Sequence, residues 1–138
     1  MKSLRQQIFL NSSRNWDIVY LENELDQYRT MDFQSKFKQA QNQLDTISQA
    51  RLVISSRLHT VLPAIALETP TIYVKDIDTR QQGLLDFVKY HYTPKQFANN
   101  PVKIIITCLQ DKNWRPDEKI NDLQRVFSII MKEQVLSL

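Results

Sequence analysis

The sequence contains a single glycine, Gly83, among its 138 residues. Phosphate-binding loops and dinucleotide-binding turns each need several glycines, because the backbone must come close to the phosphate groups. The sequence therefore excludes both kinds of site. If this protein binds an anion, we expect it to use side chains and the N–H groups at the beginning of a helix.

Cysteine is equally scarce. Cys108 is the only one, so no disulfide can form within the chain. It lies in the apolar stretch KIIITCLQ, where we expect a buried structural thiol rather than a nucleophile. This cysteine usage fits the cytoplasm, which is the location that we expect. Runs of about eighteen apolar residues are also missing, so we expect no transmembrane segment.

The chain has little net charge. Lys and Arg number 18 and Asp and Glu number 15, which gives +3, and the cations are scattered along the sequence. A nucleic-acid partner is therefore not expected. Asp76, Asp78 and Arg80 follow one apolar segment and predict either a solvated loop or one side of a ligand cleft. No third ligand accompanies the two aspartates, and we expect neither a metal nor a cofactor.

What the sequence does contain is an alternation of short apolar segments with longer amphipathic ones. The short segments are rich in β-branched residues, and the longer ones repeat apolar residues at helical spacing. Strands are expected over residues 16–23, 51–55 and 71–74. Helices are expected over residues 33–50, 58–68, 83–91 and 117–136.

The segment 33–50 shows the helical period most clearly. Asp32 stands directly before it and is a plausible N-cap. Its apolar residues step by four, three, four and three, and are Phe33, Phe37, Ala40, Leu44 and Ile47. This spacing predicts one apolar face.

Residues 99–110 allow two interpretations. Asn100 followed by Pro101 is typical of an N-cap and a first helical position. The β-branched run that follows, residues 104–107, is equally typical of a strand. We favour the helix.

The order of these elements predicts the fold class. Strands that alternate with helices form a parallel sheet, and short apolar strands indicate helices on both of its faces. We therefore expect one α/β domain over residues 1–138, with a small Rossmann-like sheet of three or four strands. A sheet of that size suggests one lobe of a two-lobed protein.

The polar stretch Ser55-Ser56-Arg57-Leu58-His59 lies between an expected strand and an expected helix. Ligands of open parallel sheets bind beyond the carboxyl ends of the strands, and the N-terminus of the next helix attracts anions. Ser55 or Ser56 can cap that helix or offer a hydroxyl group to a ligand. Arg57 can hold a carboxylate or phosphate through two parallel hydrogen bonds, and His59 can donate a hydrogen bond or move a proton.

A purely structural role is the alternative for this stretch. Arg57 would then pair with a surface carboxylate, and His59 would donate to a backbone carbonyl inside the core. The geometry separates the two interpretations in part, because two residues of a regular helix turn by about 200°. Arg57 and His59 can converge only if Arg57 still belongs to the turn before the helix.

The stretch RLVISSRLHTVLPAIALETPTIYV resembles the C-terminal lobe of the polysaccharide pyruvyl transferase family. The shared pattern is an amphipathic helix, an apolar strand, Ser-Arg-Leu-His, an all-apolar helix, Thr-Pro and a second apolar strand. The resemblance covers residues 33–90, and Ser-Arg-x-His is its most specific part. It implies one lobe of a two-lobed transferase of the GT-B type, a glycosyltransferase fold.

Members of that family move a pyruvyl group from phosphoenolpyruvate to a sugar as a ketal, during cell-surface polysaccharide and exopolysaccharide biosynthesis. The resemblance implies that Arg57 and His59 take part in donor binding and catalysis. It implies phosphoenolpyruvate and a glycan acceptor as the substrates. In this assignment His59 is the general acid or a phosphate partner, Arg57 is the anion clamp, and Ser55 and Ser56 contribute to substrate binding.

The sequence also departs from the family pattern. Glu68 stands where the family often has glycine. We expect the N-terminal lobe to be missing and the chain to be a truncated domain that needs a separate chain, or self-association, to complete the enzyme. Two alternatives remain open. In the first, the chain is a non-catalytic remnant of such an enzyme. In the second, it is the donor-binding lobe of another GT-B-like glycosyltransferase.

Overall fold

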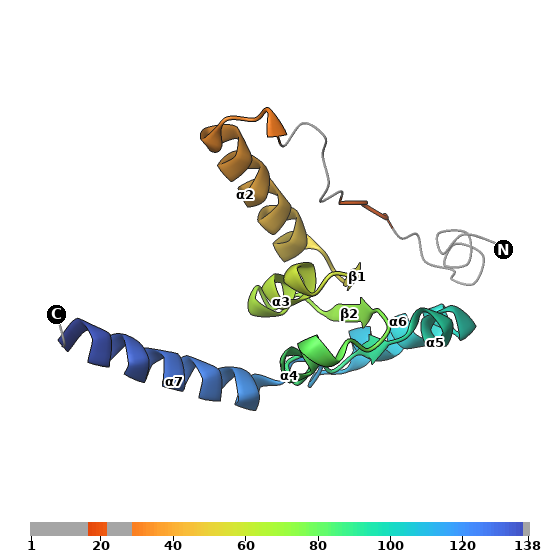
Figure 1. The fold of residues 1–138 in the computed structure, drawn as a ribbon. Helices are drawn as coiled ribbons and strands as arrows, with labels where there is room; N and C mark the ends of the chain where they lie inside the picture. Colours follow the sequence, from red (N-terminus) through yellow and green to blue (C-terminus); the bar gives the residue numbers. More distant parts are fainter. Residues whose placement is uncertain (1–16, 22–28, 137–138) are drawn as a thin grey trace.

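The computed structural model describes residues 17–21 and 29–136 (Figure 1). Its strands are β1 (Val53–Ser55), β2 (Thr71–Val74) and β3 (His91–Tyr92). Its longer helices are α2 (Phe33–Gln49), α3 (Leu58–Ala66), α6 (Pro101–Gln110) and α7 (Asp117–Leu136). Its shorter helices are the 3-10 turn η2 (Thr79–Gln81), α4 (Gln82–Leu85) and α5 (Pro94–Asn99).

The three strands form one parallel sheet in the order β1-β2-β3, with β2 in the centre. Ile54 of β1 pairs with Ile72 of β2, and Tyr73 of β2 pairs with His91 of β3. Helices α3 and α4 connect the strands and complete the strand–helix alternation. The structure confirms the expected α/β class and a small, open, Rossmann-like sheet.

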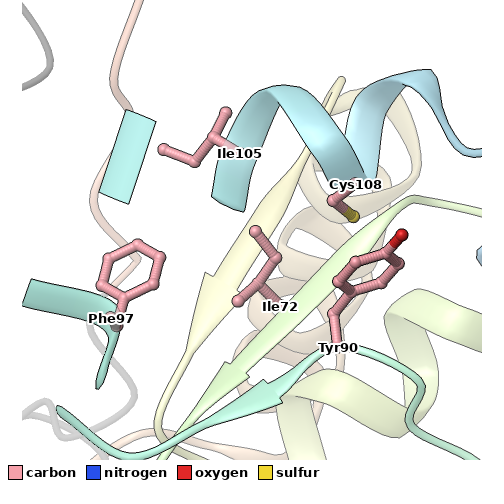
Figure 2. Packing of buried hydrophobic residues seen from close by; sticks show 5 residues of the cluster. All are labelled: Ile72, Tyr90, Phe97, Ile105 and Cys108. Carbon is pink, nitrogen blue, oxygen red and sulfur yellow. The ribbon is translucent and has the colours of Figure 1, made fainter. Parts of the chain in front are cut away.

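Helices cover both faces of this sheet. Side chains of successive strand residues point to opposite faces, so Ile72 and Tyr73 lie in different layers. Figure 2 shows Ile72 among side chains of α5, α6 and the residue before β3. This first cluster consists of Ile72, Tyr90, Phe97, Ile105 and Cys108. The second cluster, on the other face, consists of Leu58, Val61, Ile65, Tyr73 and Val88.

Cys108 belongs to the first cluster and is fully buried. Burial raises the pKa of its thiol to about 11, so the thiol stays protonated at neutral pH. The expectation of a buried cysteine in α6 is confirmed. Trp114, which follows α6, packs against both clusters and joins the two layers around the sheet.

The predicted helix boundaries hold where capping residues mark them. Asp32 is the N-cap of α2 and accepts a hydrogen bond from the Ser35 N–H group at 3.1 Å. Asn100 is the N-cap of α6, and Pro101 is its first residue, so the helical interpretation of this segment is confirmed. The helix expected over residues 83–91 was too long. Only α4 is helical there, and His91 already belongs to β3.

The strand expected over residues 16–23 is wrong for the residues that the structure describes. Residues 17–21 have no strand pairing, and Val19 and Tyr20 are more than half exposed. Residues 16, 22 and 23 lie outside the described ranges. The β-branched composition of this segment favours a strand only when a neighbouring strand is present to pair with it. The third strand of the sheet is β3 instead.

Helices α2 and α7 extend away from the body of the domain, and each meets it near one end (Figure 1). The apolar face predicted for α2 is mostly uncovered, since Phe33 is 81% exposed and only Ile47 is buried. The apolar residues of α7 are similarly exposed, as Leu123 and Phe127 show. No helix in the described ranges is long and apolar enough to cross a membrane.

Candidate functional site

The candidate site lies where β1 ends and α3 begins. Ser55 is the last residue of β1, and Ser56 follows it on the surface. Arg57 has an extended backbone (φ −116°, ψ 119°) and is the N-cap of α3. His59 is the second residue of α3. The chain therefore places all four predicted site residues within one tight connection at the carboxyl edge of the sheet, as the strand–helix pattern predicts.

The Ser55 hydroxyl forms a local hydrogen bond within this connection. Its Oγ accepts a hydrogen bond from the Arg57 N–H group at 3.1 Å and lies 3.5 Å from the Arg57 carbonyl oxygen. The expectation that Ser55 or Ser56 caps the helix is wrong, because Arg57 occupies the N-cap position. No side-chain hydrogen bond caps α3. Its first N–H groups and the positive end of its dipole therefore face the carboxyl edge without a serine oxygen.

The position of Arg57 meets the geometric condition for joint action with His59. Arg57 belongs to the turn, so the rotation of a regular helix does not fix the angle between the two side chains. Leu58 lies between them and is buried in the second cluster, which anchors the start of α3. Arg57 is half-buried and His59 is exposed. That the two side chains bind one ligand stays a prediction.

The loop after β2 is held by an ion pair of its own. The Asp78 carboxylate accepts hydrogen bonds from Nε and Nη2 of Arg80 at 3.1 and 3.0 Å. These bonds lower the pKa of Asp78, which stays ionised at neutral pH. The Arg80 guanidinium is thus turned toward its own loop, and this geometry supports the solvated loop over the wall of a ligand cleft.

The sheet also carries a row of polar side chains that the sequence did not predict. Strand register places Ser55, Tyr73 and His91 side by side on one face. The Tyr73 and His91 rings stack with their centroids 5.0 Å apart, and His91 Nε2 lies 2.8 Å from the Lys75 carbonyl oxygen. The Tyr73 hydroxyl donates to Gln81 Oε1 at 3.0 Å. Because β3 has only two residues, no sequence periodicity could have revealed this row.

Helix α3 is followed by a residue that is unusual for its backbone conformation. Glu68 has a φ of 62°, in the left-handed region that favours glycine. Its N–H donates to the Ile65 carbonyl, and the Thr69 N–H donates to the Ala64 carbonyl. This pair of bonds is the Schellman motif, whose left-handed position usually carries glycine. The Glu68 carboxylate also pairs with Arg115 at 3.1 Å.

We expect the Glu68→Gly substitution to raise the free energy of unfolding by about 0.5–1 kcal/mol. Relief of the left-handed backbone outweighs the loss of an ion pair whose carboxylate is largely exposed and which contributes about 0.2–1 kcal/mol. Urea unfolding followed by circular dichroism measures the change. Glu68→Ala is the control, because it loses the ion pair and keeps the strain, and it should destabilise the chain. A Gly variant no more stable than the Ala variant would contradict this account.

Comparison with known families gives a match to polysaccharide pyruvyl transferase over residues 5–76, just over half of the 138 residues. The matched range contains α2, β1, α3 and β2, and with them the whole Ser-Arg-Leu-His connection. Comparisons with curated proteins and with solved structures gave no match. The resemblance carried by Ser-Arg-Leu-His is thereby confirmed, and the chain belongs to the polysaccharide pyruvyl transferase family.

Proposed function

We propose that this chain carries the donor-binding half of a pyruvyl transferase that uses phosphoenolpyruvate to form a ketal on a glycan of the cell surface. The observation that carries the proposal is the Ser-Arg-Leu-His connection, which lies inside the family match and immediately before a helix without a side-chain cap. Phosphoenolpyruvate has a phosphate and a carboxylate. An arginine fork and a helix N-terminus are both suited to bind such groups.

The chemistry assigns different tasks to Arg57 and His59. Ketal formation needs a proton on the methylene carbon of phosphoenolpyruvate, which becomes the methyl group. Two sugar oxygens then bond to the adjacent carbon, and the C–O bond to phosphate breaks. His59 is the proposed general acid for the first step, or a partner of the phosphate. Arg57 is the proposed clamp that holds the anion and stabilises the departing phosphate.

The acceptor glycan needs contacts beyond this connection. We propose that a second lobe, on a separate chain or a longer one, supplies them and closes the site in the manner of a GT-B-like transferase. Because phosphoenolpyruvate is a cytoplasmic metabolite, the reaction belongs in the cytoplasm. In this arrangement the chain binds the donor, and turnover requires the second lobe.

A thermal-shift titration with phosphoenolpyruvate tests donor binding by the chain alone. We expect a ligand-dependent rise in the midpoint of unfolding for the wild type, because a ligand that binds only the folded state stabilises it. Arg57→Ala should weaken binding by about ten- to a hundredfold, the value of a charge-assisted contact. Titrations with inorganic phosphate and with pyruvate show which end of the donor Arg57 holds.

Arg51→Ala is the matched control. Arg51 is exposed and precedes β1, so it lies at the opposite end of that strand from Arg57. Its removal should leave the titration unchanged. Equal shifts in wild type, Arg57→Ala and Arg51→Ala, or no shift in any of them, would refute donor binding at this connection.

A further inference from the structure

Helix α7 presents an apolar stripe that no described part of the chain covers. Ile120 is half-buried and packs against the second cluster, which fixes the start of the helix on the body. Beyond it the helix projects alone (Figure 1). The stripe residues after Ile120 are between 45% and 62% exposed and are Leu123, Val126, Phe127, Ile130 and Met131. Several exposed apolar side chains on one face of a helix indicate an interaction surface.

Part of α7 repeats its apolar residues at the spacing of a coiled-coil seam. Ile120, Leu123, Phe127 and Ile130 are spaced by three, four and three residues, which places them at alternating a and d positions of a heptad. Asp122 and Arg125 form an ion pair of 3.3 Å on the opposite, solvated side of the helix. Apart from Ile129, which is 51% exposed, the residues on the face opposite the stripe are polar.

The residues along one edge of the stripe determine which helix can pair with α7. One flank carries Lys119, Val126 and Glu133 at successive g positions. In an antiparallel pair of α7 helices, g positions of one copy face g positions of the other. Lys119 then meets Glu133 of the second copy, Val126 meets Val126, and Glu133 meets Lys119. The same register pairs Leu123 of each copy with Phe127 of the other in the core.

We propose that α7 is a self-association helix, which pairs antiparallel with α7 of a second copy of this chain about a twofold axis near Arg125. The stripe can pair with its own copy and the flanking charges are complementary, as an isologous interface requires. A parallel pair would instead place Lys119 opposite Gln124 and Val126 opposite Met131, without any opposite charges. Lys119 also lies 3.8 Å from Asp86 of its own chain, a long and exposed contact that leaves its ammonium accessible.

Sedimentation equilibrium of the 138-residue chain tests the proposal. We expect a monomer–dimer equilibrium with a dissociation constant at or below about 100 μM. Phe127→Asp should make the chain monomeric, and because Phe127 is 62% exposed its replacement should leave the circular dichroism spectrum and the unfolding midpoint of the monomer unchanged. A wild type that stays monomeric at higher concentration, or a Phe127→Asp variant that still dimerises, would overturn the proposal.

Charge exchange tests the antiparallel register. Lys119→Glu and Glu133→Lys should each weaken dimerisation by about tenfold, because each places like charges opposite one another at two symmetric contacts. The double variant should restore the wild-type dissociation constant. Lys132→Glu is the matched control, since Lys132 lies at the outward f position. A double variant that dimerises no better than the single ones would overturn the register.

Discussion

Replacing Ile72 by alanine is expected to lower the free energy of unfolding by about 3 kcal/mol. Ile72 is fully buried in the middle of the central strand, where it pairs with Ile54 of β1. It lies in the first cluster between the side chains of α5 and α6 (Figure 2). Loss of three methyl and methylene groups there removes their transfer free energy and leaves a cavity, and such changes cost about 2–5 kcal/mol.

The effect should be large relative to the whole stability of the domain. Domains of this size unfold with about 5–15 kcal/mol, and this one buries little of α2 and α7. Urea unfolding followed by circular dichroism measures the difference. Ile77→Ala is the matched control, because Ile77 follows the same strand and is 68% exposed. Its substitution should cost less than about 0.5 kcal/mol. An Ile72→Ala variant as stable as Ile77→Ala would show that the first cluster does not support the sheet.

The elements around Ile72 are the ones that the sequence predicts well. Strand β2 and most of helix α3 are apolar, and a position between other layers explains such composition. Thr69-Pro70 separates them, because proline cannot continue a helix. These two elements and β1 carry the candidate site. The location of Arg57 and His59 at the carboxyl edge was therefore predictable from the residues alone.

The secondary structure predicted from the sequence is wrong where a local pattern is short, or where a strand forms only beside a neighbouring strand. Strand β3 has two residues and follows a helical pattern, so no period of two could indicate it. Helix α5 was missed although a signal was present. Thr93 and Gln96 form a capping box around Pro94, a sequence signature of a helix start. Residues 17–21 show the opposite case, in which strand propensity exists without a neighbouring strand.

Amphipathic spacing likewise predicts a helix without predicting what covers it. The steps of the apolar residues in α2 are regular, and the helix forms where they indicate. Phe33 and Phe37 nevertheless remain exposed, because no described segment lies over them. The N-cap of α3 likewise depends on contacts that residue type alone does not reveal. Serine is the better capping residue by type, but the hydrogen bond from the Arg57 N–H group to Ser55 places the helix start two residues later.

Replacing Thr69 by valine is expected to loosen α2 from the body of the domain. Thr69 is 2% exposed, and its hydroxyl donates to the carbonyl of Ile47 in the last turn of α2 at 3.0 Å. The Thr69 N–H donates to Ala64 at the end of α3. One residue thus joins the ends of both helices. Ile47 is the only buried residue of α2, so this contact is where the helix is held.

Valine has nearly the same shape as threonine and lacks the hydroxyl donor. We expect a loss of about 1–2 kcal/mol, because the buried Ile47 carbonyl loses the bond from the Thr69 hydroxyl and keeps the longer bond from the Ala50 N–H group at 3.2 Å. Hydrogen exchange should also become faster in α2 while the amides of β2 remain protected, which a general destabilisation would not produce.

Two further substitutions complete the test. Thr69→Ser keeps the hydroxyl and should preserve the protection of α2. Thr46→Val is the matched control, because the Thr46 hydroxyl donates to Asn42 within α2 on the exposed side, and its loss should cost less than about 0.5 kcal/mol. If Thr69→Val leaves exchange in α2 unchanged, then the apolar contact of Ile47 alone holds the helix, and the attachment of α2 to the domain does not depend on this hydrogen bond.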